Sequence, residues 1–161
     1  LKRLAASWRL PTSPAAFIDA NIPIYAAGRP HPLKKPSIEV LRLIPEHPQA
    51  FMTDAEVFQE LIHRYISSRM WPLGKEVFRQ FAVLMTSRVE SVQAADLEFA
   101  AVIADVHPQL ASRDLVHVAV MERLGLRRII LGDKGFDRLP GIERPDPGRF
   151  DDWQASLLSG S

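Results

Sequence analysis

The sequence contains no cysteine and no long apolar run, and these two absences exclude whole classes of protein. Without cysteine there is no disulfide framework, no thiolate metal site and no cysteine nucleophile. No apolar stretch approaches the roughly 18 residues that are needed to span a bilayer, so we expect no transmembrane segment. The lack of cysteine is consistent with a protein of the reducing cytoplasm.

The sequence also lacks a strong excess of charge of either sign. The formal net charge is +1, which by itself argues neither for nor against a nucleic-acid partner. Hydrophobic residues make up 47% of the 161 residues and charged residues 24%, close to the averages of globular domains. A chain of this length can bury most of its apolar surface in one core, so a wholly disordered or coiled-coil protein is excluded.

One domain is expected, over residues 15–148. Residues 1–14 do not form the apolar core of a signal peptide, because Arg9, Pro11 and Pro14 interrupt their apolar positions. We interpret them as an N-terminal arm or a cloning remnant. Residues 149–161 are expected to form a C-terminal tail. The sequence shows no internal repeat and no low-complexity tract.

Short apolar runs alternate along the chain with segments of helical periodicity. The runs predict strands at 15–18, 50–53, 88–93 and 128–131, and the periodic segments predict helices at 21–27, 37–44, 54–68, 71–85, 94–106 and 112–124. Thr53 and Glu56 have the spacing of a capping box at the start of one helix. Strands that alternate with helices predict an α/β protein, a three-layer α/β/α domain with a central parallel sheet.

Acidic residues stand near the predicted carboxyl ends of the strands, where parallel sheets bind their ligands. Asp19 follows the first strand and Asp133 comes just after the fourth, while Asp114 lies in the first turn of a helix. Glu60 lies beside the apolar stripe of the 54–68 helix. If folding gathers these four carboxylates, their repulsion requires a cation. Oxygen ligands select Mg²⁺ or Mn²⁺, and such sites hydrolyse phosphodiesters through metal-activated water.

Each of these acids also has an ordinary structural interpretation. Asp19 and Asp133 could serve as turn formers. Asp114 could stabilise the N-terminus of its helix through the helix dipole, and Glu60 could be a solvated residue at the flank of its helix. Spacing alone therefore leaves the metal site and these structural roles as alternatives.

Four neighbours of the acids bear on this choice. Asn21 could orient an acid or cap a helix, and His117 is interpreted as a packed core histidine rather than a ligand. Without the four acids, the rest of the protein carries a charge of +5. Arg113 and Lys134 adjoin the acids in sequence and are the favoured candidates for guiding a phosphate backbone. Further basic candidates are Lys34, Lys35, Arg64, Arg69 and Arg138.

The residue strings around the acids resemble, in order, the motifs of the PIN domain family. The opening motif resembles residues 17–21 (FIDAN), and the second acidic helix resembles residues 56–65 (EVFQELIHRY). The family's Asp-x-x-His-x-Ala helix is similar to residues 112–121 (SRDLVHVAVM). Its closing motif resembles residues 130–142 (ILGDKGFDRLPGI). The likeness extends over residues 16–147.

This resemblance implies a metal-dependent endoribonuclease of the VapC toxin type, which acts in a toxin–antitoxin pair. It implies that Asp19, Glu60, Asp114 and Asp133 are the catalytic, metal-binding acids and that the cofactor is Mg²⁺ or Mn²⁺. The implied substrate is RNA, and the implied partners are a cognate antitoxin that blocks the site and a second copy of the chain in a homodimer.

Two positions depart from the family pattern and favour an alternative. Leu131 stands where the family usually has Thr or Ser, and Gly135 stands where it often has another acid. These departures favour a catalytically silent RNA-binding or interaction module on the same fold. A third alternative, a small-molecule phosphohydrolase, ranks below both because no Asp-x-Asp pair follows the first strand.

Overall fold

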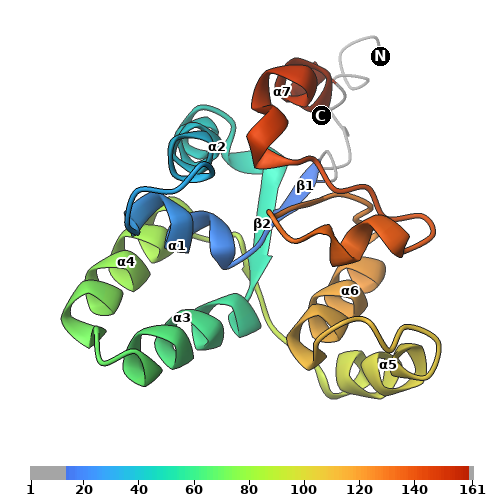
Figure 1. Cartoon of the computed structure of the whole chain (residues 1–161). Coiled ribbons are helices and arrows are strands. Elements are labelled where there is room, and N and C mark those ends of the chain that lie inside the picture. The colour runs from blue at the N-terminus through green and yellow to red at the C-terminus, as the bar shows by residue number, and fades with distance from the viewer. Residues whose placement is uncertain (1–13, 160–161) are drawn as a thin grey trace, which may run out of the picture.

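The structure, a computed structural model, describes residues 14–159 of the chain (Figure 1). Of the segment 1–14 that was interpreted as an arm or remnant, all but Pro14 lies outside the described residues. A four-stranded sheet with strand order β3-β2-β1-β4 forms the centre, and every pairing in it is parallel. The strands are β1 (Ala16–Ile18), β2 (Phe51–Asp54), β3 (Val89–Glu90) and β4 (Ile129–Ile130). The predicted parallel sheet is therefore confirmed.

Helices cover both faces of this sheet, which confirms the predicted three-layer α/β/α architecture. Figure 1 shows one group on one side, and its members are α1 (Asn21–Ala27), α2 (Lys34–Glu46), α3 (Ala55–Ser67) and α4 (Trp71–Leu84). The other side carries α5 (Ala94–Ala104) and α6 (Ser112–Leu124). Short 3-10 helices lie at Pro48–Ala50, Lys134–Arg138 and Pro147–Arg149. Within residues 14–159, no helix combines the length and the apolar character needed to cross a membrane.

The expected tail at 149–161 contains a further helix, α7 (Phe150–Ser159), that packs on the domain. Its Leu157 is buried, and the helix contacts α2. The indole nitrogen of Trp153 donates a hydrogen bond of 2.7 Å to the Asp146 carbonyl. Residues 150–159 thus belong to the folded domain, although they follow β4, the last strand of the sheet.

The strands are short, and they are almost entirely apolar at the centre of the sheet because helices cover both of its faces. All three residues of β1 have no exposed surface. Phe17 pairs with Met52 of β2 on one side and with Ile129 of β4 on the other. The carboxyl ends of these strands consequently meet at one edge of the sheet, where the candidate acids were expected.

The start of α3 differs from the expectation, because the capping box of Thr53 and Glu56 is wrong. Thr53 lies within β2, and its hydroxyl donates to the Ile18 carbonyl at 2.9 Å. Asp54 is the residue that caps α3, and its Oδ1 accepts a hydrogen bond of 2.9 Å from the Val57 amide. The strand therefore extends one residue further than predicted and ends in a buried carboxylate.

Helices α3 and α4 approach each other closely at Gly74. A Cβ atom placed on Gly74 would lie 2.2 Å from the Cβ of Tyr65, far inside van der Waals contact. Because Tyr65 Cβ is fixed to the backbone, only a shift of one helix could make room. The absence of a side chain at Gly74 therefore sets the distance between the two helices.

We expect Gly74→Ala to lower the free energy of unfolding. Helix propensity alone would stabilise this variant by about 1 kcal/mol, but overpacking of a tight contact costs about 1–3 kcal/mol or more. Urea denaturation measures the balance. Lys75→Ala, an exposed neighbour in the same helix, is the control and should change stability by less than about 0.5 kcal/mol. A stabilised Gly74→Ala protein would contradict the close approach.

Candidate active site

Asp19 lies directly after β1 at the carboxyl edge of the sheet, and it is buried. Its Oδ2 accepts a hydrogen bond of 2.9 Å from the backbone amide of Asn21. The Asn21 side chain instead accepts a bond of 3.3 Å from the Gly132 amide, beyond β4. Ala20, not Asn21, occupies the N-cap position of α1. Asn21 therefore orients the acid through its backbone and joins the exits of β1 and β4 through its side chain.

His117 of α6 and Asp54 form a buried pair beneath this edge. His117 Nδ1 lies 2.8 Å from Asp54 Oδ2, and both side chains have no exposed surface. Since the carboxylate accepts, Nδ1 carries a proton. The imidazole packs against the Phe17 ring at a centroid distance of 5.2 Å. The interpretation of His117 as a packed core histidine is thus confirmed.

The second ring nitrogen of His117 faces the candidate acids. Nε2 is buried and has no hydrogen-bond partner among the described residues. It lies 3.8 Å from Asp19 Oδ1 and 4.0 Å from Glu60 Oε2. Ligand atoms of Asp19, Glu60 and His117 all lie within 4.8 Å of one another. Ligands about 2.1 Å from one cation are separated by at most about 4.2 Å, so a small inward movement would suit a single ion.

Asp114 and Asp133 lie further from the centre of this group. Asp114 is half-buried in the first turn of α6, where its Oδ2 accepts from the Ala111 amide at 3.3 Å. Asp133 is exposed, and its Oδ1 accepts from the Gly135 amide at 2.9 Å. The structure therefore brings Asp19 and Glu60 together, and it places Asp133 at an exposed turn beyond β4.

The pKa values show how strongly these groups interact. Burial raises the pKa of Asp19 to about 6, with Glu60 and Asp114 adding repulsion, although His117 and the Asn21 amide oppose the rise. Burial likewise raises the pKa of Asp114, and the charges of Asp133 and Glu60 act in the same direction. Asp114 is therefore electrostatically coupled to each of the other three predicted acids.

His117 carries the balancing positive charge. Burial alone would lower the pKa of His117, but the hydrogen bond to Asp54 and the negative charges of Asp54, Glu60 and Asp19 raise it to about 10. At neutral pH and without a cation the ring is therefore an imidazolium. It partly neutralises a cluster of acids that would otherwise repel one another.

Sequence reasoning missed Asp54 and gave Glu56 a different role. Asp54 follows a buried apolar run as Asp19 does, and that parallel was the available signal. Burial raises the pKa of Glu56, and the charges of Asp54 and Glu60 contribute, so Glu56 belongs to the surroundings of the cluster. Arg113 forms an ion pair of 3.5 Å with Glu60 at the cluster's edge.

Leu131, at one departure from the family pattern, is a core residue. Its side chain is buried, and its carbonyl accepts a bond of 3.1 Å from Arg144. Arg144 also pairs with Asp137 at 2.7 Å. The loop after β4 is therefore held by Arg144, and Leu131 contributes apolar contacts but no hydroxyl to the site.

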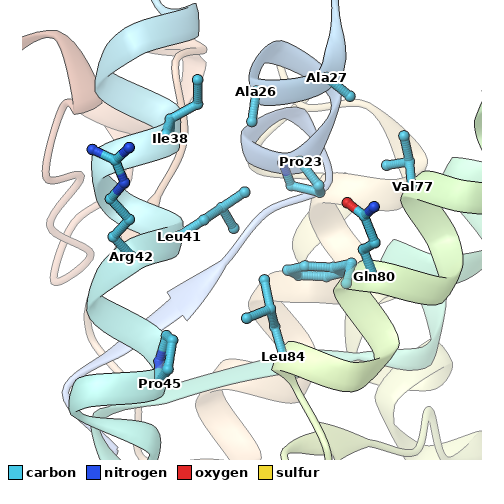
Figure 2. A pocket seen from close by; sticks show the side chains of 11 residues that line it. Pro23, Ala26, Ala27, Ile38, Leu41, Arg42, Pro45, Val77, Gln80 and Leu84 are labelled. Carbon is cyan, nitrogen blue, oxygen red and sulfur yellow. The ribbon is translucent and has the colours of Figure 1, made fainter.

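A groove between α1, α2 and α4 differs from the acidic cluster in the chemistry of its lining. Figure 2 shows this groove of about 380 Å³, which is lined mostly by apolar side chains such as Leu41 and Leu84. Among the lining residues that the structure describes, Arg42 is the one charged residue, and none is a carboxylate or a histidine. The groove therefore offers a contact surface but no group for hydrolysis. The candidate active site is therefore the group of Asp19, Glu60 and Asp114 around His117, which we call the acidic cluster.

We expect His117→Ala to destabilise the protein by about 3–5 kcal/mol, because it leaves the Asp54 carboxylate buried without its charged partner. Thermal or urea unfolding measures the loss. His63→Ala, which removes an exposed histidine of α3, is the matched control and should have an effect below about 0.5 kcal/mol. Equal stabilities of the two variants would refute the structural importance of the pair.

Comparison with known proteins places most of the chain in one sequence family. A model of the PIN domain family matches residues 16–142. Ribonuclease VapC23 of Mycobacterium tuberculosis is 36% identical over 116 residues, which cover 70% of this chain and 88% of that protein. Ribonuclease VapC13 of the same species is 32% identical over 128 residues, covering 80% and 97% of the two chains.

Solved structures show the same fold at lower identity. VapC20 of Mycobacterium tuberculosis, described as a sarcin–ricin loop cleaving toxin, superposes with a TM-score of 0.62 and 19% identity, covering 76% of this chain and 92% of that one. VapBC2 of Rickettsia felis, bound to a promoter DNA fragment, gives a TM-score of 0.61 and 15% identity, covering 81% and 97%.

Proposed function

Because the chain belongs to the PIN domain family, we propose that it is a VapC-type endoribonuclease, the toxin of a toxin–antitoxin pair. The curated relatives, which it matches over most of their length, are named ribonucleases. The single observation that carries the chemistry is the convergence of Asp19, Glu60 and His117 within 4.8 Å at the carboxyl edge of the sheet. This convergence supplies the means to bind a divalent cation.

The residues present suit such a cation. Among residues 14–159, Asp19 Oδ1 accepts no hydrogen bond and lies 3.8 Å from Nε2 of His117, a buried nitrogen that likewise has no hydrogen-bond partner there. Asp54 holds the imidazolium of His117 from its far side, so this ring stands beside the acids as a positive charge and is not one of the proposed ligands. We propose that Asp19, Glu60 and Asp114 hold the cation and that Asp133 contributes from the rim through water. Carboxylate oxygens favour Mg²⁺ or Mn²⁺ as the ion.

When bound, the cation supplies Lewis acidity toward water and charge stabilisation for the phosphate. The protein's own residues do the positioning. Asp54 and the Asn21 amide fix His117 and Asp19 in place. Arg113, partly exposed beside Glu60, is placed to pair with a phosphate oxygen of the RNA. Water attacks phosphorus in line and gives up a proton to the solvent, while the P–O bond opposite to it breaks and the leaving oxygen takes up a proton from the solvent.

For the partners, we propose an antitoxin and a second copy of the chain. The apolar groove between α1, α2 and α4 has the character of surfaces that receive an amphipathic protein segment, which supports its use by the antitoxin (Figure 2). Ile62 and Ile66 lie one turn apart on α3 and are both exposed, which supports burial of this helix in a homodimer. A cytoplasmic location would give the enzyme access to RNA.

The alternative, a silent RNA-binding or interaction module, is favoured by Leu131 and Gly135. Leu131 is buried in the core and Gly135 offers no carboxylate, so the fourth acidic position depends on Asp133 alone. One assay distinguishes the nuclease from the silent module. Cleavage of RNA with Mn²⁺, and its loss with EDTA, supports the nuclease, whereas metal-independent RNA binding without cleavage supports the module.

We expect Asp19→Asn to reduce Mn²⁺-dependent RNA cleavage by more than about a hundredfold. Loss of a residue that merely orients a metal ligand costs about 10–100-fold, and Asp19 is proposed as a ligand itself. The measurement is the initial rate on total bacterial RNA, with circular dichroism to confirm folding. Asp105→Asn, which changes an exposed acid at the end of α5 and outside the cluster, is the control. Full activity of Asp19→Asn would rule out this assignment.

A further prediction concerns metal and stability. A cation that binds only the folded state at ten times its Kd adds about 1.4 kcal/mol, or roughly 3–6 °C in melting temperature for a domain of this size. We expect Asp114→Asn to shrink this Mn²⁺-induced rise. Relief of repulsion should also raise its melting temperature in EDTA, unless the lost interaction with the N-terminus of α6 offsets the gain. Equal Mn²⁺ shifts in both proteins would show that Asp114 is not a ligand.

A further inference from the structure

A polar groove leads away from the acidic cluster between α1 and α3. It begins at Asn21 and Glu60, has a volume of about 490 Å³, and passes Arg113, Arg64 and Tyr25. A second hollow of about 350 Å³ continues it toward the loop after α1. Tyr25 and Arg64 line both hollows. The two therefore form one groove that connects the candidate active site with the α1–α2 loop.

The charge of this groove changes along its length. Glu60, at the end next to the cluster, is the single carboxylate among the described lining residues. Further along, the lining carries the cations Arg113, Arg64 and Arg29. Within residues 14–159, neither Arg64 nor Arg29 forms an ion pair with a carboxylate, and both are exposed. Such a row of available cations suits a chain of phosphates.

An aromatic pair stands in the same groove. The rings of Tyr25 and His31 stack with centroids 4.5 Å apart and planes 23° from parallel. His31 is held in this position because its Nδ1 accepts a hydrogen bond of 3.0 Å from the Leu33 amide. Tyr25 is only half-buried and lines both hollows. The pair therefore presents a fixed aromatic surface next to unpaired cations.

We infer that this groove binds the single-stranded RNA that flanks the scissile phosphate, with a backbone phosphate on Arg64 and a base stacked on the Tyr25–His31 pair. The inference rests on the proposed function and adds the path of the substrate. Cationic grooves with stacking aromatics are the usual means of holding single strands. Because every base has a π-face, stacking on the pair would hold the strand in position but would select little among the four bases.

Abasic substitution tests the stacking. A cleavage site is first mapped by digesting total RNA with the wild-type protein and Mn²⁺, and a short single-stranded oligonucleotide spanning it is then made with each base removed in turn. At one flanking position, base removal should lower the wild-type kcat/KM by at least about fivefold. On the intact oligonucleotide, Tyr25→Ala should lower kcat/KM by the same factor, mainly through a higher KM. Removal of that base should then cause no further loss of kcat/KM in Tyr25→Ala. Tyr25→Phe keeps the ring and should behave as wild type.

Salt dependence tests the phosphate contact. A cation that binds one phosphate of a single strand contributes about 0.7 to the slope of log affinity against log salt concentration. Arg64→Ala should therefore raise KM on every oligonucleotide and flatten the slope of log KM by about 0.7. Arg127→Ala is the matched control, because Arg127 is exposed and lies before β4, at the opposite end of the sheet. Its slope should equal that of the wild type.

The possible failures are distinguishable. A wild-type protein that cleaves no RNA with Mn²⁺ overturns the proposed function, and the inference with it. If the wild type cleaves RNA but Tyr25→Ala loses the same kcat/KM as the wild type on removal of each base, the inference alone is overturned. The inference is likewise overturned if Tyr25→Ala and Arg64→Ala cleave RNA normally but escape inhibition by the antitoxin, since the groove is then a protein-binding site. Melting curves of each variant verify folding.

Discussion

Negative charge concentrated at one edge of a buried parallel sheet is the constraint on which this structure depends. Parallel strands with helices on both faces end together, so the residues that follow β1 and β2 lie close together in the interior. Here those residues are Asp19 and Asp54, both buried. Buried like charges are strongly unfavourable unless a positive charge or a proton compensates them. The imidazole of His117, which lies between them, supplies that compensation within the chain itself.

The hydrogen bonds divide the two aspartates into different roles. Both oxygens of Asp54 are used, one by the Val57 amide and one by His117, so this carboxylate holds the structure together. Asp19 uses one oxygen for the Asn21 amide, and among the described residues its other oxygen has no hydrogen bond and lies 3.8 Å from Nε2 of His117. Nε2 is protonated in the imidazolium, so it offers positive charge to Asp19 and not a lone pair. The second oxygen of Asp19 is therefore the atom that we propose for the cation.

Much of this arrangement could be predicted from the sequence, because the apolar runs and helical periods are strong and local. The parallel sheet, the helix positions and the three layers follow from them. The helix α7 was missed because its buried surface depends largely on Leu157 and on contact with α2, which no local pattern reveals. The cap of α3 was misplaced by one residue, since pairing of Thr53 with Val89 is a long-range contact. For the site, the positions of the acids near strand ends made them candidates, but the distances that join Asp19 and Glu60 and leave Asp133 exposed depend on tertiary packing.

The net charge of +1 is the sum of a negatively charged region and a positively charged region, which become separate only in the folded chain. The acids of the cluster are largely buried, whereas Arg64 and Arg29 of the polar groove are exposed. Dissolved salt screens exposed charges far more than buried ones. Rising ionic strength should therefore weaken contacts in the groove while affecting the buried cluster less. The acids and the polar groove adjoin at Glu60, which is paired with Arg113. Under our two proposals, this ion pair therefore lies where the RNA-binding groove meets the cation site.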